Sequence, residues 1–225
     1  MKNEEKFWQQ WILNYSLGEL LGIGAAAIIA RFLFMEYSQA EHGQSPTLTG
    51  LVLTVAGTSE GLIIGYVQWR SLSRFVKNFK PAPWITVTTL TSIAGWILIL
   101  PPAVLIIFFF AKLSLLNHYT SIFYTFSAGA AFGALISTCQ FFIIRKFFNN
   151  ALIWILANTM GWALSFLILY FALSFFSGSL VNTLLIILAC ISSGLVQGIV
   201  TGTSLHFLMS IKNNVRNQLH ADPAL

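Results

Sequence analysis

The chain has 225 residues, of which 56% are hydrophobic and only 8% are charged, and its formal net charge is +5. Soluble domains carry about 25% charged residues, so this composition excludes an ordinary water-soluble fold. The basic residues are scattered over several segments, and this distribution argues against nucleic-acid binding. The composition therefore predicts an integral membrane protein in contact with the lipid bilayer.

Six stretches are long and apolar enough to cross a bilayer. A spanning helix needs about 20 apolar residues, and such windows lie near residues 14–35, 48–69, 84–110, 123–144, 151–176 and 180–209. Backbone groups in lipid must be hydrogen-bonded within their own segment, so these windows are expected to be helices. The sequence predicts an all-α, multi-pass protein with six transmembrane helices in a single membrane domain, 1–225.

The windows pair into three similar units of two helices, at about 11–79, 84–148 and 150–210, followed by a cytoplasmic tail at 211–225. In the first helix of each unit, residues 11–18 resemble residues 154–161 and, more loosely, residues 88–95. The second helices carry Gly or Ser at every fourth position: Gly57, Gly61 and Gly65; Gly129, Gly133 and Ser137; Gly194, Gly198 and Gly202. Because the three units run in the same direction, they predict a pseudo-threefold bundle.

These small residues let two helices approach closely, which is a main source of helix association in lipid. We expect the three glycine stripes to pack against other helices, with the striped helices nearest the axis. Gln68 and Gln140 follow their stripes at matching positions, where the third unit has Leu205. The two amides are expected either to form an interhelical hydrogen bond or to line a central polar pathway.

The distribution of Lys and Arg predicts the orientation. Ten of these residues fall in the segments on one side of the predicted spans, namely Lys2, Lys6, Arg70, Arg74, Lys77, Lys80, Arg145, Lys146, Lys212 and Arg216. The segments on the other side hold only Lys112. Cytoplasmic loops carry the excess of basic residues, so both termini are expected in the cytoplasm, in a plasma membrane of the bacterial inner-membrane type.

The loop after the second span combines basic and aromatic residues. Arg70, Arg74 and Lys77 share one helical face, which fits a short interfacial helix that contacts anionic lipids together with Lys80. The alternative interpretation is that these basic residues only determine the topology. Trp69, Trp84 and Trp154 are expected to include anchors at the membrane interface. These expectations place the lipid contacts at the cytoplasmic ends of the helices.

Three charged residues depart from the repeat, and all three lie in the first unit. Glu19 stands where the other units have Trp96 and Trp162, and Glu60 where they have Phe132 and Gln197. Arg31 lies about 6 Å inside the outer end of the first span. Snorkelling to the interface accounts for Arg31 and Glu19, although Arg31 can also pair with Glu60. Glu60 lies near mid-membrane, where a carboxyl is either a structural group at a helix contact or a proton or cation site.

Motifs for catalysis and for metal binding are absent from the sequence. No H-E-x-x-H, C-x-x-C, G-x-S-x-G or phosphate-loop spacing occurs, and the two Cys lie in predicted spans. We therefore expect neither an enzyme nor a metal or cofactor site. The sequence favours a non-catalytic accessory, regulatory or partner-binding membrane subunit, because only one span carries a deep charge. The alternative is a small-solute or ion transporter or channel built on Glu60 with Arg31 or Gln68. The sequence leaves the solute, any membrane-protein partner and the oligomeric state open.

Overall fold

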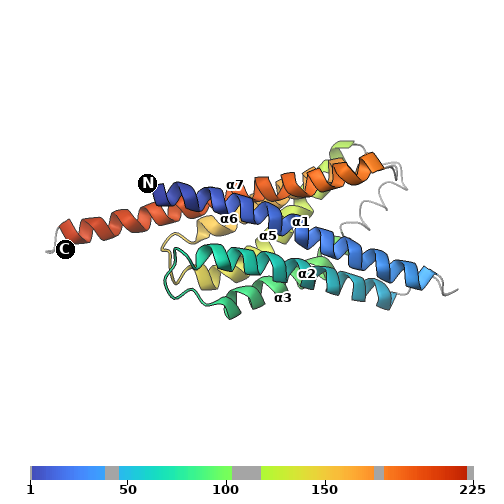
Figure 1. Cartoon of the computed structure of the whole chain (residues 1–225), viewed down its shortest axis with the longest axis horizontal. Helices are drawn as coiled ribbons and strands as arrows, with labels where there is room; N and C mark the ends of the chain where they lie inside the picture. Colours follow the sequence, from blue (N-terminus) through green and yellow to red (C-terminus); the bar gives the residue numbers. More distant parts are fainter. Residues whose placement is uncertain (1, 39–45, 103–117, 175–179, 222–225) are drawn as a thin grey trace.

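The computed structural model describes residues 2–38, 46–102, 118–174 and 180–221, and side chains within 6–25, 50–102, 119–172 and 184–212. The fold of these residues is all-helical, as predicted (Figure 1). The helices are α1 (Lys2–Ser38), α2 (Pro46–Leu72), α3 (Pro81–Leu98), α5 (His118–Ile144), α6 (Leu152–Ser174) and α7 (Leu180–Ala221). Each helix overlaps one of the six predicted windows, but α3 ends at Leu98, and residues 103–110 of the third window lie outside the described residues.

Five of the described helices are long and apolar enough to cross a membrane. The apolar stretches are Gly50–Leu72, Pro81–Pro102, Tyr119–Ile144, Leu152–Ala172 and Leu184–Lys212. The protein is therefore a multi-helix membrane protein in contact with lipid. The described part of α1 carries Gln9, Gln10, Asn14 and Glu19, and these polar residues lower its hydropathy. The length and composition of α1 therefore do not establish that it crosses the membrane, and its crossing stays a prediction.

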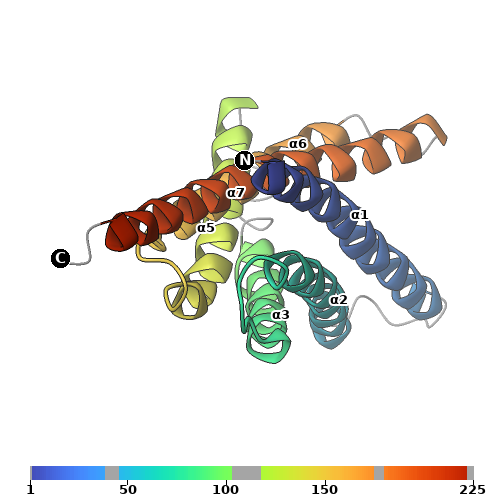
Figure 2. The same ribbon diagram turned by 60° about the vertical axis from the view of Figure 1, so that its left-hand side comes forward.

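The helices form a closed ring. Each helix packs against its neighbours in chain order, and α7 packs back against α1. Figure 2 shows α2 and α3 lying together on one side of the ring, with α1 meeting α7 on another. The contact between α3 and α5 is the least extensive of the six. This closure gives the ring an interior that side chains from every helix can reach.

The glycines of the three stripes lie at the contacts between neighbouring helices. A Cβ atom added to Gly61 would lie 2.6 Å from Cα of Thr89 on α3. The same construction places Gly133 against Asn158 on α6 and Gly198 2.9 Å from Cα of Ile12 on α1. In each case only a residue without a side chain permits this approach of two backbones. Each glycine-bearing helix thus packs against the helix that follows it around the ring.

The segments between helices follow local sequence signals. Pro81 opens α3, where its missing N–H removes no helical hydrogen bond. The regular part of α3 ends at Leu98, three residues before the Pro101-Pro102 pair. These prolines cannot donate the backbone hydrogen bonds that would extend the helix.

The prediction of a short interfacial helix after α2 is wrong. Helix α2 ends at Leu72, and residues 73–80 form turns in which Asn78 has a positive φ of 63°. Val76 and Phe79 are buried, and the Trp69 indole donates a hydrogen bond to the Phe79 carbonyl at 3.1 Å. The two apolar side chains draw this segment back toward the bundle, so a continuous amphipathic helix does not form.

Candidate functional site

Three indoles fill the centre of the ring near the end that carries the 73–80 and 145–151 loops. They belong to Trp11 of α1, Trp84 of α3 and Trp154 of α6, and each is at most 1% exposed. The Trp154 ring centroid lies 6.1 Å from that of Trp11 and 6.0 Å from that of Trp84. Trp84 and Trp154 are therefore not among the interfacial anchors that were expected within this group of aromatic residues. They pack inside, because the closed ring provides an interior large enough for three aromatic side chains.

Each indole donates a hydrogen bond to a polar side chain on the glycine-bearing helix beside it. The three bonds run from Trp84 to Oε1 of Gln68 at 3.2 Å, from Trp154 to Oε1 of Gln140 at 3.0 Å, and from Trp11 to Oγ1 of Thr201 at 2.9 Å. The hydrogen-bond acceptor in α7 is thus Thr201, one helical turn before Leu205, which the sequence comparison had matched with Gln68 and Gln140. The indole donor in α3 is Trp84, one turn before Thr88, which the same comparison had matched with Trp11 and Trp154.

A layer of buried amides lies next to the indoles. Nε2 of Gln140 donates to Oε1 of Gln68 at 3.0 Å and to Oγ1 of Thr88 at 2.8 Å. The Tyr15 hydroxyl accepts hydrogen bonds from Nε2 of Gln68 at 3.2 Å and from Nε2 of Gln197 at 3.3 Å. This network joins α1, α2, α3, α5 and α7 through side chains that are all buried. The hydrogen bond between Gln68 and Gln140 is the interhelical bond that was one of the two roles predicted for these amides.

Glu60 lies in the same interior and is 3% exposed. Its Oε2 accepts hydrogen bonds from Oγ of Ser92 at 2.8 Å and from the Trp96 indole nitrogen at 2.6 Å. A Cβ atom on Gly22 would lie 3.3 Å from Cα of Glu60, so α1 passes directly over this residue. Glu60 is therefore enclosed by α1 and α3, and both donors to its Oε2 come from α3.

Glu19 is completely buried, and neither of its carboxyl oxygens has a hydrogen-bond partner among the side chains that the structure describes. Glu19 lies three residues before Gly22, which packs over Glu60, so the two acidic residues come from the same contact between α1 and α2. A Cβ atom on Gly194 would lie 2.9 Å from Cβ of Glu19, so the backbone of α7 covers the residue. The interpretation that Glu19 snorkels to the interface is wrong, because α7 separates it from the surface. The hydroxyls of Ser16 and Ser193 are also buried without partners.

A small cavity of about 10 Å³ lies beside Glu60. Tyr15, Gln68, Ser92 and Trp162 contribute polar groups to its lining. The Trp162 indole nitrogen is buried and has no hydrogen-bond partner within the described part of the chain. A cavity needs about 10–15 Å³ to hold one water molecule. The space beside Glu60 therefore suits a single water molecule or a bare cation of similar size.

Four of the five predicted polar site residues, Glu19, Glu60, Gln68 and Gln140, meet in this interior. Arg31 lies in α1, but its side chain is outside the described part of the chain, and so is the predicted pair with Glu60. Sequence reasoning missed the roles of Tyr15 and of the three central indoles. The signal that could have identified the indoles is one Trp near the start of the first helix in every unit.

Within the described residues no group of three or more His, Cys, Asp or Glu side chains could hold a metal ion. Cys139 and Cys190 are free thiols. No protein-family model, curated protein or solved structure matches this chain. The chemistry of the site therefore rests on its own geometry: two buried carboxyls, an amide network and a water-sized space.

Proposed function

We propose that this protein is a small membrane transporter that moves a proton or a monovalent cation, with Glu19 and Glu60 as the ion-binding pair. The observation that carries the proposal is the completely buried Glu19 carboxyl, which has no hydrogen-bond partner among the described side chains and lies near Glu60 at the contact between α1 and α2. Two ionised carboxylates in such surroundings repel each other, so a bound proton or cation stabilises the pair. Carboxyls inside membrane spans are costly to bury and commonly mark ion pathways.

Polar side chains from every described helix support transport. A transporter of this size needs a polar interior contributed by more than one repeat unit. The buried polar residues include Ser16 and Glu19 on α1, Glu60 and Gln68 on α2, Thr88 and Ser92 on α3, Ser137 and Gln140 on α5, Asn158 and Ser165 on α6, and Ser193, Gln197 and Thr201 on α7. Every described helix therefore contributes polar groups to the buried interior that holds the acidic pair.

The proposal includes three tandem two-helix units around a pseudo-threefold axis. The hydrogen bonds from Trp11, Trp84 and Trp154 support this arrangement, since each joins one unit to the next. In the register set by these bonds, Ser92 and Trp162 take the place of Glu19, and Phe132 and Ser193 take the place of Glu60. Both acids thus remain unique to the first unit.

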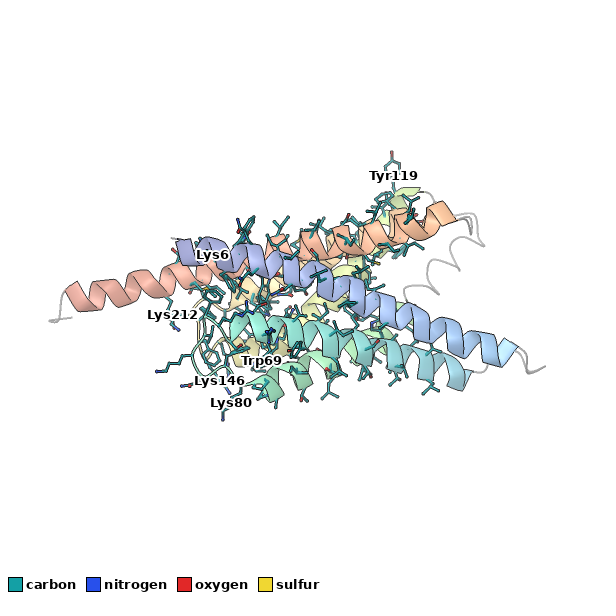
Figure 3. The ribbon with its side chains drawn as sticks, in the orientation of Figure 1. Lys6, Trp69, Lys80, Tyr119, Lys146 and Lys212 are labelled. Carbon is teal, nitrogen blue, oxygen red and sulfur yellow. The ribbon has the colours of Figure 1, made fainter. Side chains whose placement is uncertain are left out.

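The orientation is also part of the proposal. Lys6, Lys80, Lys146 and Lys212 lie toward one end of the molecule, and Tyr119 lies at the other (Figure 3). Because basic residues collect on the cytoplasmic side, we place that end and both termini in the cytoplasm, in a bacterial plasma membrane. The three central indoles then separate the acidic pair from the cytoplasm.

A second candidate is a non-catalytic accessory or partner-binding subunit. The size of the cavity beside Glu60, about 10 Å³, favours it, because this space holds one water molecule and is too small for an open ion pathway. In that role the polar network serves only to fix helix packing. Neither candidate is an enzyme or uses a cofactor.

Ion flux into proteoliposomes separates the two candidates. Vesicles that enclose a pH-sensitive dye and carry an imposed potassium diffusion potential report proton entry, and radioactive sodium reports cation entry. We expect the wild type to move one of these ions, and Glu19→Gln and Glu60→Gln to lower its flux at least about tenfold, which corresponds to about 1.4 kcal/mol. Glu5→Gln, which removes a carboxyl near the N-terminal end of α1, is the matched control. Absence of flux in the wild type would overturn transport and leave the accessory role.

A further inference from the structure

A pocket of about 210 Å³ opens beside the loop between α5 and α6, away from the acidic pair. Its walls come from this loop and from the end of the apolar part of α7. The lining residues are Phe147, Asn149, Asn150, Leu208, Ile211 and Lys212. None of them belongs to the amide network or to the indole cluster.

The pocket lies at the edge of the apolar zone. The apolar stretch of α5 ends at Ile144, that of α6 begins at Leu152, and that of α7 ends at Lys212. The apolar stretches of three helices therefore end beside one opening. In a bilayer the hydrocarbon core gives way to polar headgroups at this depth. A ligand in the pocket would thus lie level with the lipid headgroups.

The lining has two chemical faces. Asn149, Asn150 and Lys212 supply amide and ammonium donors, which suit the oxygens of a phosphate group. Phe147, Leu208 and Ile211 form an apolar wall. The Lys212 ammonium lies 5.5 Å from the centroid of the Phe148 ring, and this cation–π contact holds it near the opening. Such a lining matches a phosphate that is attached to an apolar body better than it matches free phosphate.

The charge at this end of the molecule favours an anion. Lys6, Lys80, Lys146 and Lys212 lie toward this end of the molecule (Figure 3). The other charged side chains described at the end of α2 and in the 73–80 and 145–151 loops are also basic, namely Arg70, Arg74, Lys77 and Arg145. Basic pockets between membrane helices bind the headgroups of anionic lipids. Of these residues, Lys212 is the one that lines the pocket.

We propose that this pocket binds the headgroup of one anionic phospholipid. The phosphate lies against Lys212 and the two asparagine amides, and the glycerol region lies against the apolar wall. The site is separate from the loop of Arg70, Arg74, Lys77 and Lys80, for which sequence predicted anionic-lipid contacts. It is also independent of transport, so it stands whether or not the acidic pair moves an ion.

Native mass spectrometry of the full-length protein in detergent, titrated with phosphatidylglycerol, tests the proposal. We expect one lipid to bind more tightly than the rest, and Lys212→Gln to weaken its binding at least about fivefold. Lys6→Gln is the matched control, because it removes one positive charge at the same end without lining the pocket. Ile211→Trp keeps every charge but fills the pocket, and we expect it also to displace the tight lipid. Thermal unfolding of each variant confirms that the fold is retained.

Two further arms distinguish the source of the phosphate. Phosphatidylcholine carries phosphate without net charge and is expected to bind more weakly than phosphatidylglycerol. Inorganic phosphate is expected not to displace the bound lipid, because it makes no contact with the apolar wall. Equal weakening by Lys6→Gln and Lys212→Gln would overturn the proposal, since it would show general charge attraction. Displacement by inorganic phosphate would overturn the assignment to a lipid.

Discussion

The side chain of Gln140 donates a hydrogen bond to Oε1 of Gln68 at 3.0 Å, although α5 and α2 are not neighbours in the ring. The bond therefore crosses the interior of the bundle. Oε1 of Gln68 also accepts from Trp84, and Oε1 of Gln140 accepts from Trp154. The two amides thus use both their donors and their acceptors to hold α2, α3, α5 and α6 in one register.

Replacing Gln140 by Leu tests this crossing. The change removes the acceptor of the Trp154 indole and the donor that reaches Gln68 and Thr88. Hydrogen bonds between membrane helices contribute about 1–2 kcal/mol in model peptides, so we expect a loss of about that size. Thermal unfolding in detergent micelles measures it.

Gln10→Leu is the control for Gln140→Leu, because Gln10 is exposed and accepts its hydrogen bond from Arg74 at 2.9 Å. Exposed interactions of this kind contribute less, so the control is expected to unfold close to the wild-type temperature. Equal destabilisation by the two variants would show that the buried amide network has no special weight in stability.

Glu19 and Glu60 are expected to respond oppositely to replacement by methionine. Glu19 has no hydrogen-bond partner, so Glu19→Met removes an unsatisfied buried group and raises stability by about 0.5–2 kcal/mol. Glu60→Met deprives Ser92 and Trp96 of their acceptor and lowers stability by about 1–3 kcal/mol. Unfolding in detergent micelles compares the two variants directly. A loss of stability in Glu19→Met would indicate a structural role for that carboxyl.

Sequence patterns predicted the positions of the helices and of the buried polar residues. They did not predict how the helices of the three units align with one another. The spacing of apolar residues located the helices, and the positions of Gln68 and Gln140 marked the amide layer. The stripe of Gly194, Gly198 and Gly202 matches itself when it is shifted by four residues, so it could not fix how α7 aligns with α2 and α5. The indole bonds to Thr201 and Gln68 supply that register, and they depend on contacts between distant segments.

The environment of Glu19 was beyond sequence reasoning for a related reason. Its distance from the end of the helix is compatible with snorkelling, and only the position of α7 excludes it. Gly194 brings that helix onto Glu19 from a segment far along the chain. The burial of Glu19 therefore depends on the position of α7. The sequence of α1 alone does not predict that contact.

The glycine contacts predict a sharp difference between two substitutions by alanine. In Gly61→Ala the new Cβ would lie 2.6 Å from Cα of Thr89, so α2 and α3 would have to separate. We expect a loss of about 1–3 kcal/mol, as for overpacking in other close-packed interiors. Gly24→Ala is the control, because a Cβ at Gly24 meets nothing within 4 Å. The alanine there is expected to leave stability unchanged or raise it by up to about 1 kcal/mol.

Monodispersity in size-exclusion chromatography and unfolding temperature measure both glycine variants. If Gly61→Ala behaves like Gly24→Ala, the close approach of α2 and α3 at Gly61 is not needed for folding.

The membrane crossing of α1 can be tested by the side from which single cysteines are labelled. After Cys139 and Cys190 are replaced by alanine, single cysteines are introduced at Lys6, Lys80 and Tyr119. An impermeant maleimide is then applied to intact cells and to inverted membrane vesicles. Lys6 and Lys80 lie toward one end of the molecule and Tyr119, which is 80% exposed, lies at the other (Figure 3).

We expect the cysteines at positions 6 and 80 to react only in inverted vesicles and the one at position 119 to react only in intact cells. Because α2 separates residue 80 from the segment after α1, labelling of positions 6 and 80 from the same side requires α1 to cross the membrane. If position 6 is labelled with position 119, α1 does not cross, and the number of spans falls to five. The carboxyl of Glu19 would then lie outside a membrane span, and its proposed role in ion transport would lose its physical basis.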